Sequence, residues 1–176
     1  MLRKAGLLHA TAAGMTAVRA QAVAEGGTAF IYLNDSAAPD QTRQAVIQLF
    51  AGKEGIAEVI MPDRFAALGL PMPANNKHMA DLILAARDDY AFSDVATGDE
   101  EIRPAILGVS CVGNHGYLNT NPKMNAIFIA SGRDIHTGVK IGLINNTSVA
   151  PTAAQVLGLQ IPGAEGRTLV EILLER

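Results

Sequence analysis

One histidine of this sequence stands in a setting that could do chemistry. His115 lies in the Gly-Asn-His-Gly-Tyr segment 113–117, directly after the apolar residues 105–112. Gly113 and Gly116 let the backbone reach positive φ angles and leave room for a bound group. A polar loop after an apolar strand is where α/β sheets present ligands, and a neutral imidazole is a common zinc ligand. A metal ligand at His115 is one interpretation of this segment. The alternative is a turn histidine bonded to the backbone.

Further residues along the chain extend this pattern. They are residues 113–132, Val149-Ala150-Pro151-Thr152-Ala153-Ala154, Leu157-Gly158-Leu159, Pro162 and Gly166-Arg167. On these residues the chain resembles the C-terminal end of the type I phosphodiesterase/nucleotide pyrophosphatase family, which belongs to the alkaline phosphatase superfamily. The resemblance runs from Leu2-Arg3-Lys4-Ala5-Gly6-Leu7-Leu8 through nearly the whole chain, and it matches only the C-terminal part of a family member.

The resemblance implies a fold, a cofactor and a role for His115. In the family, a Gly-x-His-Gly-Tyr loop gives one histidine to a site for two zinc ions, and a threonine or serine acts as the nucleophile. The resemblance thus implies that His115 binds zinc and that residues 104–176 belong to an alkaline-phosphatase-like sheet.

The rest of that site has no counterpart in the sequence. The resemblance implies an Asp-His-Gly element earlier in the chain, but the only His-Gly pair is His115-Gly116, which Asn114 precedes, and no Asp-x-x-x-His occurs. No Thr or Ser has the family's nucleophile setting, whereas a catalytic zinc needs about three protein ligands. We therefore expect a hydrolase fragment that is inactive alone, whose complete relatives act on phosphoester or nucleotide-like small molecules. The alternative is a non-catalytic binding or remnant domain that associates with itself or with an N-terminal partner half.

Other candidates are weaker. Tyr117 could contact substrate, or its ring could pack over the loop with the hydroxyl in water. Leu118 stands where the family has a polar or acidic residue, which counts against substrate contact by this loop. The remaining candidates are interpreted as core, loop, turn or surface residues: His9, His78, His136, Lys123, Arg133, Asp88-Asp89 and Asp99-Glu100-Glu101.

Composition restricts the class of protein. Hydrophobic residues make up 49% and charged residues 18% of 176 residues, which is an ordinary globular balance. The net charge is −3 and no basic cluster occurs, so nucleic-acid binding is not expected. Cys111, the only cysteine, is interpreted as a small buried hydrophobe. No apolar stretch has the roughly 20 residues of a membrane helix.

The first residues only faintly imitate a signal peptide. Arg3 and Lys4 precede a short apolar region that is followed by His9. A signal peptide has a longer apolar region, so we interpret this start as mature sequence and leave the compartment open.

The fold class expected is α/β, with residues 1–103 forming a small α+β subdomain. Its predicted elements are a strand over Thr28–Leu33, a helix over 39–51, a strand over 56–61, a short helix over 62–68 ending at Gly69, and a strand over 81–86 that forms a hairpin with 90–92. Residues 16–24 are compatible with a strand or a helix.

Residues 104–176 are expected to continue as buried-sheet strands with short connections. The apolar runs are 105–112 and 126–130, residues 139–143 are a candidate for another strand, and helices are predicted over 152–157 and 168–174. Because a piece of a larger sheet leaves an edge and an apolar face uncovered, the sequence predicts self-association or a partner.

Overall fold

The computed structural model describes residues 1–11, 13–95, 101–104 and 113–174. These residues combine α-helices with antiparallel β-sheets and divide into two compact units, Met1–Asn125 and Ala126–Arg176. The division falls after residue 125, later than the boundary expected after residue 103. The reason is that residues 118–123 are anchored on the first unit, through contacts described below.

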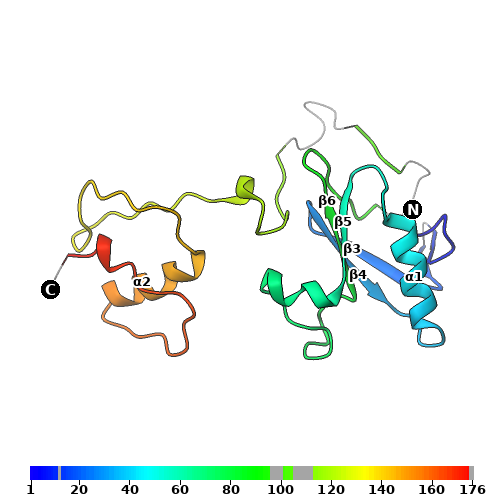
Figure 1. Ribbon diagram of the computed structural model, residues 1–176, viewed down its shortest axis with the longest axis horizontal. Helices are drawn as coiled ribbons and strands as arrows, with labels where there is room; N and C mark the ends of the chain where they lie inside the picture. Colours follow the sequence, from blue (N-terminus) through cyan, green and yellow to red (C-terminus); the bar gives the residue numbers. More distant parts are fainter. Residues whose placement is uncertain (12, 96–100, 105–112, 175–176) are drawn as a thin grey trace. The chain divides into compact units, whose positions relative to one another are not determined.

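The first unit is built on a four-stranded antiparallel sheet (Figure 1). Its strand order is β3-β4-β6-β5, formed by Ala20–Ala24, Thr28–Leu33, Leu82–Ala86 and Ile56–Ile60. The strands predicted over 28–33, 56–61 and 81–86 are thereby confirmed, and residues 20–24 are a strand. A separate two-stranded sheet joins β1, His9–Thr11, to β2, Gly14–Thr16.

Helix α1, Pro39–Phe50, packs on one face of this sheet. Val46 and Phe50 of α1 form an apolar cluster with Ile31 of β4 and with Leu82 and Leu84 of β6. Proline in the first turn has the φ angle of a helix. The negative charge of Asp40 beside it is stabilised by the positive end of the helix dipole. The helix predicted over 39–51 is confirmed.

A second apolar cluster lies on the other face. Ile83 and Ile60 of the sheet pack with Phe65 and Leu68 of two 3-10 turns, Pro62–Arg64 and Ala66–Leu68, and Leu118 packs against the cluster. Strand β6 is thus covered on both faces, which is why its sequence, Leu-Ile-Leu-Ala-Ala, is apolar throughout. The helix predicted over 62–68 is replaced by these two turns, and Gly69 ends them at a φ of +73°.

The hairpin predicted between residues 81–86 and 90–92 is wrong. Strand β6 has β4 on one side and β5 on the other, so neither edge is open to a third strand. Instead the chain crosses the turn between β3 and β4. There the Phe92 amide donates to the Gly26 carbonyl at 2.7 Å, and the Ala24 amide donates to the Asp94 carboxylate at 2.8 Å.

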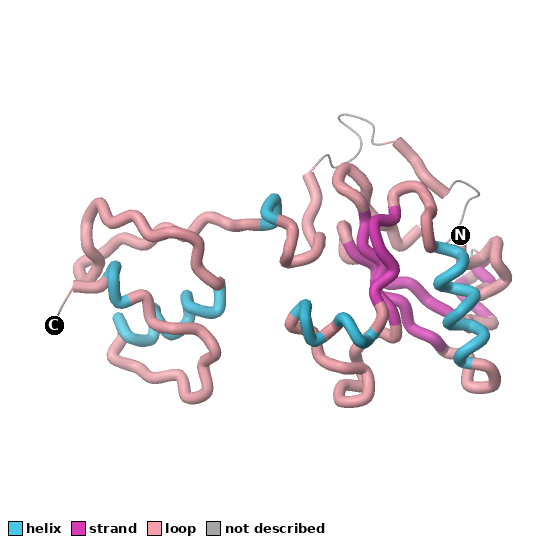
Figure 2. The backbone as a smooth tube through the Cα atoms, viewed as in Figure 1, coloured by secondary structure: helices cyan, strands magenta, loops and turns pink. Residues whose placement is uncertain are grey.

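The second unit contains little regular structure (Figure 2). Helix α2, Val149–Val156, includes most of the predicted helix 152–157. The strands predicted over 126–130 and 139–143 do not form, and the helix predicted over 168–174 is one 3-10 turn, Val170–Ile172. The predicted strand 105–112, with Cys111, lies outside the described residues. Within the unit, the buried Thr152 hydroxyl donates to the Ser148 carbonyl at 2.6 Å and accepts from the Leu169 amide at 2.9 Å.

Candidate functional site

The loop that carries His115 lies against residues 25–27, the turn between β3 and β4. The Gly27 amide donates to the His115 carbonyl at 2.8 Å. Gly116 has a φ of +73°, and a Cβ atom there would stand 1.6 Å from the Glu25 carbonyl oxygen. Glycine is therefore required at 116 both for its backbone conformation and for this close approach.

Tyr117 fastens the same loop. A Cβ atom on Gly27 would stand 2.3 Å from the Tyr117 ring, so the ring lies directly on this glycine. The Tyr117 hydroxyl donates to the Tyr90 carbonyl at 2.7 Å. The ring packs, as one of the two interpretations of the sequence has it. The hydroxyl differs from that interpretation because it binds the backbone. Substrate contact by Tyr117 stays a prediction.

The side chain of His115 is left outside these contacts. The residue is exposed, and its amide donates to the Asn114 side chain at 2.9 Å. The hydrogen bonds of His115 all use its backbone, and its imidazole has no hydrogen-bond partner among the described residues. The arrangement is a fixed backbone that presents an exposed imidazole.

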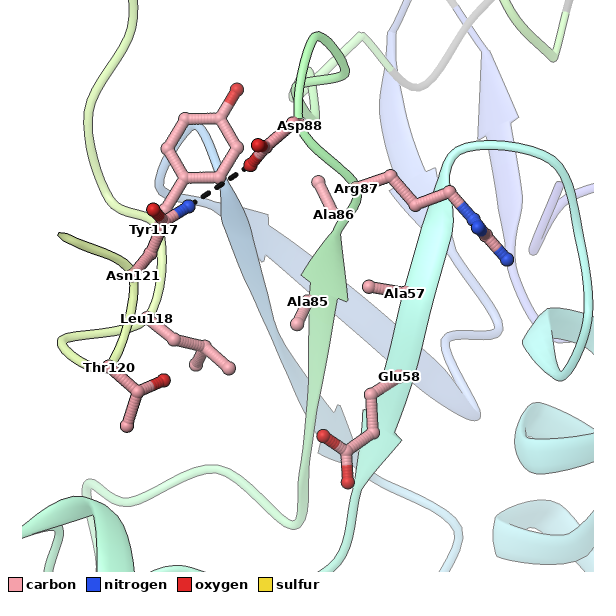
Figure 3. Close-up of a pocket in the computed structure, with 10 residues that line it drawn as sticks. All are labelled: Ala57, Glu58, Ala85, Ala86, Arg87, Asp88, Tyr117, Leu118, Thr120 and Asn121. Carbon is pink, nitrogen blue, oxygen red and sulfur yellow. Dashed lines mark hydrogen bonds between the residues drawn. The ribbon is translucent and has the colours of Figure 1, made fainter. Parts of the chain in front are cut away.

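A hollow of about 280 Å³ lies beside this loop, over β5 and β6 (Figure 3). Its sheet side is formed by the small side chains of Ala57, Ala85 and Ala86, and Tyr117 and Leu118 stand opposite. The other lining residues are Glu58, Arg87, Asp88, Thr120 and Asn121. His115 does not line it.

The charged groups of the hollow are already bound. The Asp88 carboxylate accepts from Lys123 at 2.7 Å and from Asn121 at 3.0 Å, and these hydrogen bonds, with that to Lys123 first, lower the pKa of Asp88. Glu58 pairs with Arg64 at 2.9 Å. The guanidinium of Arg87 points away from the hollow and donates to the Ile56 carbonyl. Lys123, interpreted from the sequence as one of the residues without a site role, is thus paired with a carboxylate.

The other histidines have contacts or exposed positions of their own. His9 lies in the exposed β1–β2 hairpin, the His78 carbonyl accepts from Tyr32, and the His136 amide donates to the Ile172 carbonyl. In the ranges that the structure describes, no three side chains of His, Cys, Asp or Glu are grouped as a metal site requires. The described residues thus fit one ligand of a zinc ion, and they do not fit a complete zinc site.

Sequence reasoning missed one charged cluster, at the start of α1. The Asp35 carboxylate accepts from Arg19 at 2.8 Å and from the fully buried Thr42 hydroxyl at 2.7 Å. The hydrogen bond from Thr42, then that from Arg19, lowers the pKa of Asp35 to about 2. The available signal was an aspartate between a strand and a helix that begins with proline. The cluster joins β3, β4 and α1, and all its polar groups are bound to one another.

Comparisons of the chain with protein-family models, with curated proteins and with solved structures found no match. No helix in the described part of the chain is long and apolar enough to cross a membrane.

Proposed function

We propose that this chain is the C-terminal part of a metal-dependent phosphodiesterase or nucleotide pyrophosphatase and that His115 is one of the zinc ligands of the complete enzyme. The observation that carries the proposal is the exposed imidazole of His115 on a loop fixed by Gly27, Gly116 and Tyr117. A metal ligand needs this combination, because its backbone has to be held in place while its ring nitrogen stays accessible.

The proposal includes an alkaline-phosphatase-like fold for the complete enzyme. An alkaline-phosphatase-like core would require the second unit to join a larger sheet. The apolar residues 126–130 have the composition of a strand for such a sheet, and residues 139–143, with Val139 and Ile141, are a second candidate strand.

The remaining parts of the site come from polypeptide other than these 176 residues. The sequence holds neither the family's Thr or Ser nucleophile setting nor an Asp-His-Gly element. We therefore propose that an N-terminal partner half supplies the nucleophile and the other ligands of two zinc ions. The substrate class is a phosphoester or nucleotide-like small molecule, and the chain alone does not hydrolyse it.

The first experiment uses the purified chain. Zinc content and hydrolysis of a chromogenic phosphodiester are measured together. We expect far less than one zinc ion per chain and no turnover. Turnover that EDTA abolishes would contradict the proposal that the nucleophile lies elsewhere.

The second experiment adds the missing half. The chain is co-expressed with the polypeptide encoded immediately upstream, and phosphodiester hydrolysis is measured for wild type, His115→Ala and His78→Ala. We expect hydrolysis that is lost in His115→Ala and kept in His78→Ala, because both histidines are exposed and only His115 lies on the fixed loop. No hydrolysis, or equal hydrolysis in both variants, would overturn the proposal.

A non-catalytic binding or remnant domain is the second candidate function. The observation that favours it is the exposure of large apolar side chains in the second unit, such as Leu157 at 71% and Leu159 at 60%. Such side chains mark surfaces that other polypeptides cover. This candidate gives no hydrolysis in the co-expression experiment.

A further inference from the structure

Residues 126–130 form the most exposed apolar segment of the second unit. The segment is Ala-Ile-Phe-Ile-Ala, and its order is the same in both directions. Ile127 is 88% exposed and Ile129 is 83% exposed, whereas Phe128 between them is half-buried. β-Branched and aromatic residues favour strands, so the side chains are those of a strand that the unit itself does not form.

The backbone of this segment is also open. Within the described residues, no amide or carbonyl of residues 126–131 takes part in a hydrogen bond. Backbone without hydrogen-bond partners is a template on which another strand can add. An occupant that satisfies both the backbone and the apolar side chains is itself an apolar strand.

We propose that residues 126–130 pair antiparallel with the same residues of a second copy of this chain, about a two-fold axis at Phe128. In this register Phe128 faces Phe128 of the second copy, and Ile127 faces Ile129. Aromatic and β-branched pairs across antiparallel strands are stabilising. A palindromic strand gives the same contacts from both copies, as a two-fold symmetric interface requires.

The charges near the segment are compatible with this pairing. Residues 124–132 carry no charged side chain. The nearest bases, Lys123 and Arg133, each have a carboxylate partner in their own copy, Asp88 at 2.7 Å and Asp134 at 3.6 Å. Two copies can therefore approach without bringing unpaired like charges together. The pairing concerns the chain without the partner half proposed above, because in the complete enzyme the same residues would join the larger sheet.

The test is the self-association of the purified full chain. Sedimentation equilibrium over a broad concentration range is expected to show a dimer. In Ile127→Lys/Ile129→Lys, each lysine faces a lysine of the other copy, and like charges opposite each other destabilise the pair. We expect the dimer dissociation constant to rise at least about tenfold, which corresponds to about 1.4 kcal/mol.

A charge-swap variant tests the register. In Ile127→Lys/Ile129→Glu, each lysine faces a glutamate across the axis, and we expect the dimer to be restored relative to the double-lysine variant. Both variants remove the same two isoleucines, so a general loss of fold would affect them alike. Circular dichroism checks that the fold is kept.

Leu143→Lys is the matched control, because Leu143 is equally exposed in the same unit and lies outside the segment. Its dissociation constant is expected to equal that of the wild type. A wild-type monomer at all concentrations, a dimer unaffected by the double-lysine variant, or no restoration in the charge-swap variant would overturn the proposal.

Discussion

The two units of this protein use the same kinds of apolar side chain with opposite results. In Met1–Asn125, Ile31, Ile60 and Ile83 are at most 1% exposed, whereas in Ala126–Arg176 Ile127 and Ile129 are more than 80% exposed. The difference lies in the neighbours. Each strand of the first unit has a hydrogen-bonded strand beside it, and no strand lies beside residues 126–130 among the described residues. A strand-forming sequence becomes a strand only where another strand completes its hydrogen bonds.

Truncation of a buried leucine is expected to cost more stability in the first unit than in the second. Leu82 and Leu169 are both fully buried, one in each unit. We expect Leu82→Ala to lower the free energy of unfolding by about 3–5 kcal/mol, because β6 is packed on both faces. Leu169→Ala is expected to cost about 2 kcal/mol, since Ala154 and Ile172 are the only further buried apolar residues in the described part of its unit and the site can collapse. Urea unfolding, with hydrogen exchange to assign each unit, measures both losses. Equal losses would mean that the second unit is as tightly packed as the first.

Within the first unit, the position of the His115 loop depends on the close contact of Gly116 with the Glu25 carbonyl. Gly116→Ala is expected to destabilise the docked loop by about 1–3 kcal/mol, because alanine is strained at positive φ and its Cβ would overlap the Glu25 carbonyl. Exchange of the Gly27 amide, which donates to His115, measures this opening. Gly113→Ala is the control, since a Cβ atom there meets nothing within 4 Å. Equal exchange in the two variants would show that the close contact at residue 116 does not hold the loop.

The smallest effect on stability is expected when the pH is lowered. The folded pKa of Asp35 is about 2, below its ordinary 3.8, so its hydrogen bonds stabilise the first unit above pH 3.8 and that stabilisation is lost as the pH falls through about 2. Asp35→Asn is expected to lower stability at neutral pH and to remove this part of the pH dependence. Unfolding measured from neutral pH to pH 2 checks it. An unchanged acid profile in the variant would exclude Asp35 as its source.

Glu171 allows the same measurement in the second unit. Its hydrogen bond with Arg167 lowers its pKa to about 2 from 4.5, so its contribution is present above pH 4.5 and is lost as the pH falls. The Glu171 side chain is more exposed than that of Asp35, 36% against 12%. We therefore expect added salt to weaken the contribution of Glu171 more than that of Asp35.

Local patterns were enough to predict much of the first unit. Strand β4 and helix α1 follow from a run of β-formers and from a proline-led segment with spaced apolar residues. The position of residues 90–92 could not be predicted in this way. It depends on both edges of β6 being occupied, and that is decided by strand order and not by local sequence.

The candidate site divides in the same way. Residue types identified His115 and the two glycines of its loop. That Gly26-Gly27 is the surface beneath this loop, and that the Tyr117 hydroxyl reaches Tyr90, could not be derived from spacing. These residues are far apart in sequence. The contacts of Asp35 were missed because Arg19, directly before β3, and Thr42, in α1, are brought to it only by the fold.

The sequence by itself determined the strands and helix of the first unit and the histidine between glycines, because backbone propensity and apolar periodicity are local properties. Only the tertiary structure decided which turn holds the loop of His115, which charges pair, and that residues 126–130 stay exposed. Those outcomes depend on hydrogen bonds and contacts between distant segments, and each requires a partner whose position local sequence does not specify.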